Sequence, residues 1–193
     1  MNSNRILIKL SGEFISIGSY KSQFDINALI KSIKVLLSQG YQICIVIGGG
    51  NICRGRDLYN QDLRKTWQID KVGMLATMIN ANMLSALLSN HDVNNVILSS
   101  IAMPQFFETY TYHLSEEYLD KGRVVVFAGG TAMSGVSTDT LAVTRAVEMS
   151  INKVIKVTTI DGVYDSDPVS NKDARRIDSV SSVECFNCYF CLK

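Results

Sequence analysis

The residues best suited to chemistry lie in glycine-rich segments that follow runs of apolar, β-forming residues. The clearest is 45–55, IVIGGGNICRG, where three glycines end an apolar run and Arg54 comes four residues after Gly50. Glycine allows the backbone to approach a ligand closely, and successive N–H groups can surround an anion. An arginine beside them can contact a phosphate through two hydrogen bonds. We interpret this segment as a phosphate-binding loop, with a tight strand-to-helix turn as the alternative.

Two common phosphate motifs do not fit this segment. No Gly-Lys-Ser/Thr follows the glycines, which excludes a Walker A loop. The dinucleotide-binding fingerprint requires a glycine at position 53, which is Cys53 here. The segment therefore predicts a phosphate site of another kind.

Two other segments offer groups that bind phosphate. Segment 9–13, KLSGE, brings a lysine at a strand end close to Ser11 and Gly12; the alternative is an edge lysine and a plain turn. Segment 128–139, AGGTAMSGVSTD, is a second glycine-rich loop. Thr138 or Asp139 could cap the next helix, whose N-terminus would favour an anion. The alternative for Asp139 is an N-cap with no other role.

A fourth segment, 158–168, reads TTIDGVYDSDP. Its Asp-Gly pair indicates a turn, and Tyr164 could stack on a nucleotide base. The alternative is a surface turn with solvated aspartates. Each segment alone is a weak signal, but four of them at strand ends describe a site for two phosphate-bearing ligands.

Alternating strands and helices must position these segments. We expect strands at 5–10, 42–47, 95–99, 123–128 and 153–157, and helices at 25–39, 71–90, 114–120 and 139–150. The apolar strands predict a mainly parallel sheet covered on both faces, which is a three-layer α/β/α sandwich, in a single domain 1–193. Ligands bind at the carboxyl ends of the strands in such sheets, so the four segments should converge there.

Composition limits the other functions. The 193 residues carry a formal net charge of +1, so no overall field attracts nucleic acid or an acidic membrane surface. No apolar run approaches the roughly 20 residues of a membrane span, and the N-terminus does not read as a signal peptide. We therefore expect a cytoplasmic protein without nucleic-acid or membrane partners. His91 and His113 fall outside the loops, and we interpret both as surface or packing residues.

Five motifs, in this order, resemble the bacterial uridylate kinase (UMP kinase) family of the amino acid kinase superfamily. They are KLSGE at 9–13, IGGGNICRG at 47–55, DKVGMLATMINA at 70–81, STDT at 137–140 and KVTTIDGVYDSDP at 156–168. The resemblance covers about residues 5–180 and implies transfer of the γ-phosphoryl group of ATP, bound with Mg²⁺, to UMP. It also implies a cytoplasmic homohexamer of pyrimidine nucleotide synthesis, regulated by GTP and UTP.

The resemblance assigns roles by position and assigns no metal ligand to the protein. The catalytic residues would be Lys9, Arg54 and Asp139. The ATP-binding residues would be Lys9, Leu10, Ser11, Gly12, Gly50, Arg54, Thr158, Tyr164 and Asp167. The UMP-binding residues would be Gly49, Asp70, Thr131, Ala132, Met133, Ser134, Gly135, Val136, Ser137 and Thr138.

The chain departs from the family pattern in two places. The family loop Gly-Thr-Gly-Asn-Pro-Phe is GTAMSG at 130–135, and Met133 cannot donate or accept hydrogen bonds as an amide does. We therefore expect UMP affinity or base selectivity to differ. The chain also ends in SVSSVECFNCYFCLK, without the helix and strand that continue the family fold, which predicts a C-terminally shortened domain.

Two alternatives follow from that ending. One is a degenerate kinase that binds nucleotide or assembles without turnover. The other is a metal-binding protein, because Cys185, Cys188 and Cys191 have the spacing of iron–sulfur ligands. Against it, the five cysteines of a cytosolic chain are typically free thiols.

Overall fold

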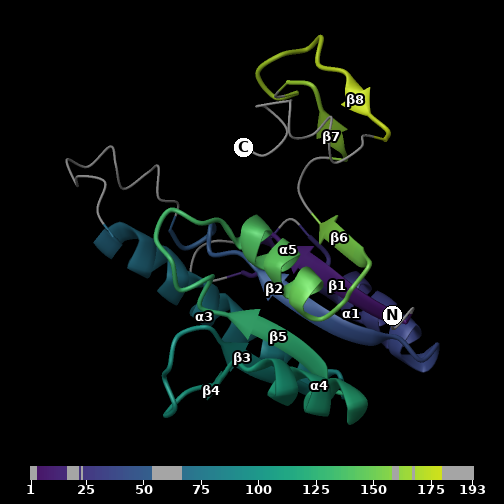
Figure 1. The fold of residues 1–193 in the computed structure, drawn as a ribbon. Helices are drawn as coiled ribbons and strands as arrows, with labels where there is room; N and C mark the ends of the chain where they lie inside the picture. The colour runs from purple at the N-terminus through teal and green to yellow at the C-terminus, as the bar shows by residue number, and fades with distance from the viewer. Residues whose placement is uncertain are drawn as a thin grey trace. The chain divides into compact units, whose positions relative to one another are not determined.

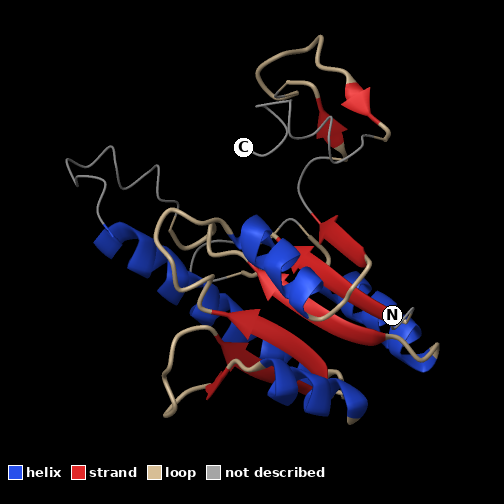
Figure 2. Ribbon diagram, in the orientation of Figure 1, coloured by secondary structure: helices blue, strands red, loops and turns tan. Residues whose placement is uncertain are grey.

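The computed structural model describes residues 4–16, 22, 24–53, 67–157, 161–166 and 168–179. They fall into two compact units, 1–157 and 158–193, which are described one at a time. The first unit contains a six-stranded sheet in the order β4-β3-β5-β2-β1-β6, and every neighbouring pair is parallel. Figures 1 and 2 show this sheet and its helices. The strands are β1 (Arg5–Leu10), β2 (Gln42–Ile47), β3 (Asn95–Ser99), β4 (Glu108–Thr109), β5 (Val124–Ala128) and β6 (Lys153–Val157).

Helices cover both faces of this sheet. The helices are α1 (Ile26–Ser38), α3 (Trp67–Asn90), α4 (Tyr112–Asp120) and α5 (Thr138–Glu148), and a 3₁₀ turn, η1, spans Gly12–Phe14. Ile8 and Ile45 belong to the core cluster that contains residues of α1 and α3. Leu7 and Val46 point the other way, into the cluster with α4 and α5. The predicted three-layer α/β/α arrangement with a parallel sheet is therefore confirmed.

The predicted elements match closely, with differences at their ends. Asp25 caps α1, because its carboxylate accepts hydrogen bonds from the N–H groups of Asn27 and Ala28. Helix α3 begins at Trp67, four residues before the predicted start. The short elements η1 and β4 were not predicted, because two or three residues are too few to show a hydrophobic period.

Helix α3 corrects the expectation that no apolar segment reaches membrane-spanning length. The helix has 24 residues, and an 18-residue stretch of it has a mean hydropathy of 1.4. By length and composition alone, it could cross a membrane. This is weak evidence for a membrane helix, because a core helix passes the same test. Met78, Ala81 and Leu84 are buried in the core against the sheet. Packing against the sheet therefore explains the buried face of α3, while Val72, Leu75, Ile79 and Met83 are exposed apolar residues of the same helix.

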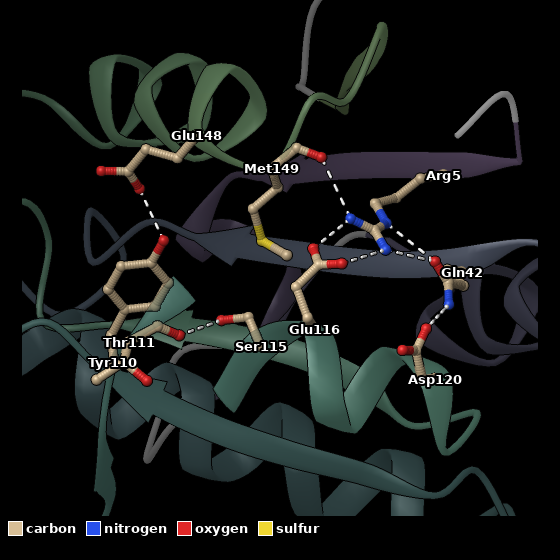
Figure 3. Close-up of polar contacts among 9 residues, drawn as sticks. All are labelled: Arg5, Gln42, Tyr110, Thr111, Ser115, Glu116, Asp120, Glu148 and Met149. Carbon is tan, nitrogen blue, oxygen red and sulfur yellow. Dashed lines mark hydrogen bonds and ion pairs between the residues drawn. The ribbon is translucent and has the colours of Figure 1, made fainter. Parts of the chain in front are cut away.

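A polar cluster ties α4 and α5 to the amino ends of β1 and β2 (Figure 3). The buried Arg5 donates hydrogen bonds to Glu116 Oε1 at 2.5 Å, and to the Met149 carbonyl at 3.2 Å. Its other nitrogens donate to Gln42 Oε1 at 3.0 and 2.7 Å. Gln42 donates in turn to Asp120 of α4 at 3.0 Å. This cluster satisfies a buried guanidinium at the amino ends of the strands, where no predicted site residue lies.

The second unit contains a short antiparallel pair of strands. Strand β7 (Val163–Tyr164) pairs with β8 (Arg176–Ile177). Tyr164 donates a hydrogen bond to Asp161 Oδ1 at 2.7 Å. The Asp165 carboxylate accepts from the backbone N–H of Arg175 at 2.8 Å, which closes the turn.

Candidate functional site

The loops that follow β1, β2 and β6 are joined directly by backbone hydrogen bonds. The N–H of Gly48 donates to the Leu10 carbonyl at 2.9 Å, and the N–H of Ser11 donates to the Val157 carbonyl at 3.3 Å. Ser11 then caps η1, because its hydroxyl accepts from the Glu13 N–H. The carboxyl ends of three parallel strands therefore meet at one edge, as their sequences predicted.

A cavity of about 310 Å³ lies between the loop after β2, the first turns of α3 and the loop that follows β5. Its lining residues are Gly49, Gly50, Cys53, Ile69, Asp70, Gly73, Met74, Thr77, Gly130, Thr131, Met133, Val136, Ser137 and Thr138. Most of the residues predicted to bind UMP are among them. Ala132, Ser134 and Gly135 belong to the same loop, but they are exposed and do not line the cavity.

Gly49, which follows β2, packs closely against α3. Gly49 is buried, and a side-chain carbon placed on it would come within 2.8 Å of the Ala76 Cβ. Thr77, one residue further along α3, accepts a hydrogen bond from the N–H of Gly129 at 3.0 Å. The GMLAT sequence of α3 thus supports both glycine loops through a small residue and a hydroxyl.

The loop after β5 is attached to the start of α3. The backbone N–H of Gly135 donates to Asp70 Oδ2 at 2.9 Å. Gly135 has a φ of +75°, and Ala132 has a φ of +60° in the left-handed region that favours glycine. The carboxylate that the resemblance assigns to the UMP ribose therefore holds the loop at Gly135, and the strained backbone of the loop lies at Ala132.

Helix α5 is capped by Ser137, not by Thr138 or Asp139 as the sequence predicted. The Ser137 hydroxyl accepts a hydrogen bond from the Thr140 N–H at 3.2 Å. The prediction was wrong by one or two positions, because Ser, Thr and Asp are all good caps and stand side by side. The cap at Ser137 leaves the Asp139 carboxylate available for other contacts.

The Asp139 carboxylate lies between two lysines from neighbouring strands. Lys9 Nζ is 2.8 Å from Asp139 Oδ1, and Lys156 Nζ is 2.9 Å from Oδ2. Lys9 and Lys156 are partners in the register of β1 and β6. The Lys9 side chain is 12% exposed and that of Lys156 is 55% exposed. The alternative that Asp139 is only a helix cap is therefore wrong. At the carboxyl edge of the sheet, two lysines surround one carboxylate.

The electrostatic balance keeps Asp139 ionised. Burial raises the pKa of this carboxyl, but the hydrogen bonds and positive charges of Lys9 and Lys156 outweigh burial and hold it below its usual range. At neutral pH Asp139 therefore cannot serve as a proton donor. It can orient the two ammonium groups toward an incoming anion.

Some predicted residues lie outside this unit or outside the described residues. Arg54, Thr158 and Asp167 lie outside the described residues, as do Cys185, Cys188 and Cys191. Tyr164 belongs to the second unit, on β7. Where residues are described, no three His, Cys, Asp or Glu side chains gather as metal ligands.

The sequence reasoning missed two site residues. Lys156 near the end of β6 repeats the position of Lys9 near the end of β1, and this repetition was the available signal. Asn80 was predicted only as part of the helix at 71–90, yet it is fully buried and donates to the Gly48 carbonyl at 2.7 Å. The signal in the sequence was a polar residue among the apolar residues of LATMINANML, because asparagine is mostly exposed in proteins.

Comparison with known proteins identifies the family. The model of the amino acid kinase family matches residues 4–187. The uridylate kinase of Erythrobacter litoralis is 42% identical over 179 residues, which are 91% of this chain and 74% of that protein. The chain belongs to the amino acid kinase family, among its uridylate kinases. It spans about three quarters of the length of the curated relatives it matches.

Solved structures of the family agree with this fold. The UMP kinase of Bacillus anthracis superposes with a TM-score of 0.78 at 32% identity, covering 90% of this chain and 72% of that one. The UMP kinase of Ureaplasma parvum gives a TM-score of 0.83 at 30% identity, covering 97% and 80%. The amino acid kinase fold therefore accounts for the parallel sheet and for the loops at its carboxyl edge.

Proposed function

We propose that this amino acid kinase family member transfers the γ-phosphoryl group of ATP to UMP. In this reaction a phosphate oxygen of UMP forms a bond to the γ-phosphorus. The bond from that phosphorus to the bridging oxygen of ADP breaks, and the products are UDP and ADP. Uridylate kinase relatives at about 40% identity over most of the chain support the proposal.

The observation that carries the proposal is the placement of Lys9, Asp139 and Lys156 next to a nucleotide-sized cavity. Thr138 lines the cavity, and Asp139 is the next residue of α5. Phosphoryl transfer requires little covalent chemistry from a protein and depends on positioning and charge stabilisation. Two lysines, backbone N–H groups and the N-terminus of α5 supply both.

We assign the two sides of the site to the two nucleotides. Lys9, Leu10, Ser11 and Gly12 would hold the ATP phosphates after β1. Gly49, Asp70 and the loop 131–138 would hold UMP, and Gly50 would lie between the two. Asp139 would orient the lysines, which would then neutralise charge as the phosphoryl group moves.

Mg²⁺ would arrive with ATP. Kinases of this kind generally need a divalent cation, and Mg²⁺ is commonly held by substrate phosphates with one or two carboxylates. Both Asp139 oxygens already contact lysines, and the described residues contain no group of three metal ligands, so the ATP phosphates would supply most of the ligands of the ion. When bound, the ion would supply charge neutralisation at the phosphates.

Three assigned residues outside the described residues keep the roles implied by the family resemblance. Thr158 and Asp167 would line the ATP nucleoside site, together with Tyr164. Arg54 would stabilise the transferring phosphoryl group, so Arg54→Ala should lower kcat by roughly 10²-fold or more. Equal turnover of wild type and Arg54→Ala would remove this role.

The alternative of a degenerate, nucleotide-binding protein has no observation in its favour. The contacts of Lys9 and Lys156 with Asp139 support the kinase, because they bring two positive charges to the proposed phosphate site. Product analysis separates the two readings. Purified protein with Mg-ATP and UMP should form UDP, and CMP in place of UMP tests whether Met133 has changed the base selectivity.

We further propose a single amino acid kinase-like domain that acts in the cytoplasm as a homohexamer in pyrimidine nucleotide synthesis, regulated by GTP and UTP. The family match across 4–187 supports one domain. Exposed apolar residues on one face of α3 support self-association: Val72, Leu75, Ile79 and Met83 are 40–48% exposed. Light scattering would give the oligomeric state, and turnover with added GTP or UTP would test the regulation.

A further inference from the structure

We infer that the buried Asn80 and the half-buried Asn51 form an amide pair that fixes the loop after β1 and the loop after β2 relative to each other. Asn80 Nδ2 donates to Asn51 Oδ1 at 2.7 Å, and Asn51 Nδ2 donates back to Asn80 Oδ1 at 3.2 Å. Asn80 is fully buried in α3, and Asn51 follows the glycines after β2. The pair therefore joins the helix to the second loop by two reciprocal hydrogen bonds.

Each amide also binds a backbone carbonyl. Asn80 Nδ2 donates its second hydrogen to the Gly48 carbonyl at 2.7 Å. Asn51 Nδ2 donates its second hydrogen to the Ile15 carbonyl, which ends η1 after β1, at 3.1 Å. All four amide hydrogens are thus used, and because carbonyls only accept, the orientation of both side chains is fixed.

Gly12 leaves the space that the pair requires. A side-chain carbon at this position would come within 2.5 Å of Asn51 Oδ1 and 2.9 Å of Asn80 Nδ2. It would also come within 2.7 Å of the Gly48 carbonyl oxygen. Gly12, which the family resemblance assigns to the ATP phosphates, therefore has a second reason to be glycine.

The consequence rests on the proposed function. The loop after β1 would carry the phosphoryl donor and the loop after β2 would carry the acceptor, so their separation sets the distance between the reacting atoms. Asn51 and Asn80 do not line the cavity, which makes them positioning residues. A misplacement of about 1 Å between reacting groups can cost about 10²-fold in rate.

The test compares Asn80→Ala with Asn95→Ala. Asn95 is a half-buried amide that donates to the Val93 carbonyl at 3.0 Å and to the Ser85 carbonyl of α3 at 3.3 Å, away from the loops. We expect Asn80→Ala to lower kcat by about 10²-fold with little change in the affinity for each nucleotide measured alone. Asn95→Ala should keep the wild-type kcat, although both variants lose stability.

Amide hydrogen exchange supplies a readout that does not depend on turnover. In Asn80→Ala, protection should fall together at 11–15 and at 48–53, while Asn95→Ala should leave both segments protected. If Asn80→Ala does not fold, Asn51→Ala, at a half-buried position, should give the same paired loss. Unchanged protection, or loss in one loop alone, would overturn the inference. Wild-type protein without UMP-dependent turnover would instead overturn the proposed function, and hydrogen exchange would still decide the amide pair.

Discussion

Lys9 and Lys156 are register partners on the neighbouring parallel strands β1 and β6, and both ammonium groups contact the Asp139 carboxylate at 2.8 and 2.9 Å. Side chains at paired positions of parallel strands emerge on the same face of a sheet. Two like charges would repel each other there, and the carboxylate between them offsets this repulsion. A nucleotide phosphate arriving at this edge would meet two cations that are already oriented.

Replacing Lys156 by alanine tests whether the second lysine takes part in phosphoryl transfer. We expect kcat to fall by about 10²-fold, because charge stabilisation of the transition state is lost. Lys153→Ala is the matched control, since Lys153 is an exposed lysine at the amino end of the same strand. Steady-state kinetics with UMP and Mg-ATP would measure both variants, and equal losses would contradict a specific role for Lys156.

Asp139 should make the folded protein sensitive to acid. Its pKa in the folded state lies below the ordinary value of 3.8, so its pairing stabilises the fold fully at higher pH. As the pH falls through 3.8 toward the lowered pKa, the unfolded state takes up the proton first and this stabilisation is lost. Asp139→Asn removes the titrating group.

Urea unfolding between pH 6 and pH 3 would measure this effect. The free energy of unfolding of the wild type should decrease more steeply than that of Asp139→Asn at the acid end of the range. Other carboxylates titrate in both proteins, so the difference between the two curves isolates Asp139. Parallel curves would show that the lysine contacts do not stabilise the folded state.

Gly135→Ala tests the attachment of the loop after β5 to Asp70. A side chain at a φ of +75° costs about 1 kcal/mol, which should loosen the loop and raise the KM for UMP about fivefold. Gly40→Ala is the control, because Gly40 has a φ of +81° at the end of α1 with open space around it. It should lose similar stability with an unchanged KM. An unchanged KM in both variants would mean that this loop conformation does not matter for UMP.

Glu116→Ala should destabilise the fold without changing any residue of the proposed nucleotide site. It leaves the buried Arg5 guanidinium with Gln42 and a carbonyl as partners, at a cost of about 2 kcal/mol in the free energy of unfolding. Glu117→Ala removes an exposed ion pair with Lys121 on the same helix and should cost well under 1 kcal/mol. Denaturant unfolding would give the free energy of unfolding of both variants. Similar losses would contradict the claim that the buried ion pair of Arg5 stabilises the fold more than the exposed pair of Lys121.

The central strands β2 and β5 were predictable because they are almost continuous apolar runs, as in a parallel sheet buried on both faces. The glycine segments were predictable for a related reason, since glycines at strand ends mark a close approach of the backbone. The role of Lys156 could not be predicted, because it depends on the register of β1 with β6. These two strands are far apart in the sequence. The same holds for Asn80, whose partners Gly48 and Asn51 come from another segment.

The most direct test of the proposed kinase is ADP release from Mg-ATP in the presence and absence of UMP, measured for wild type and Lys9→Ala. We predict rapid ADP release by the wild type that requires UMP and yields UDP in equal amount, and a loss of about 10²-fold or more in Lys9→Ala. A folded wild-type protein whose ADP release does not respond to UMP would contradict the account.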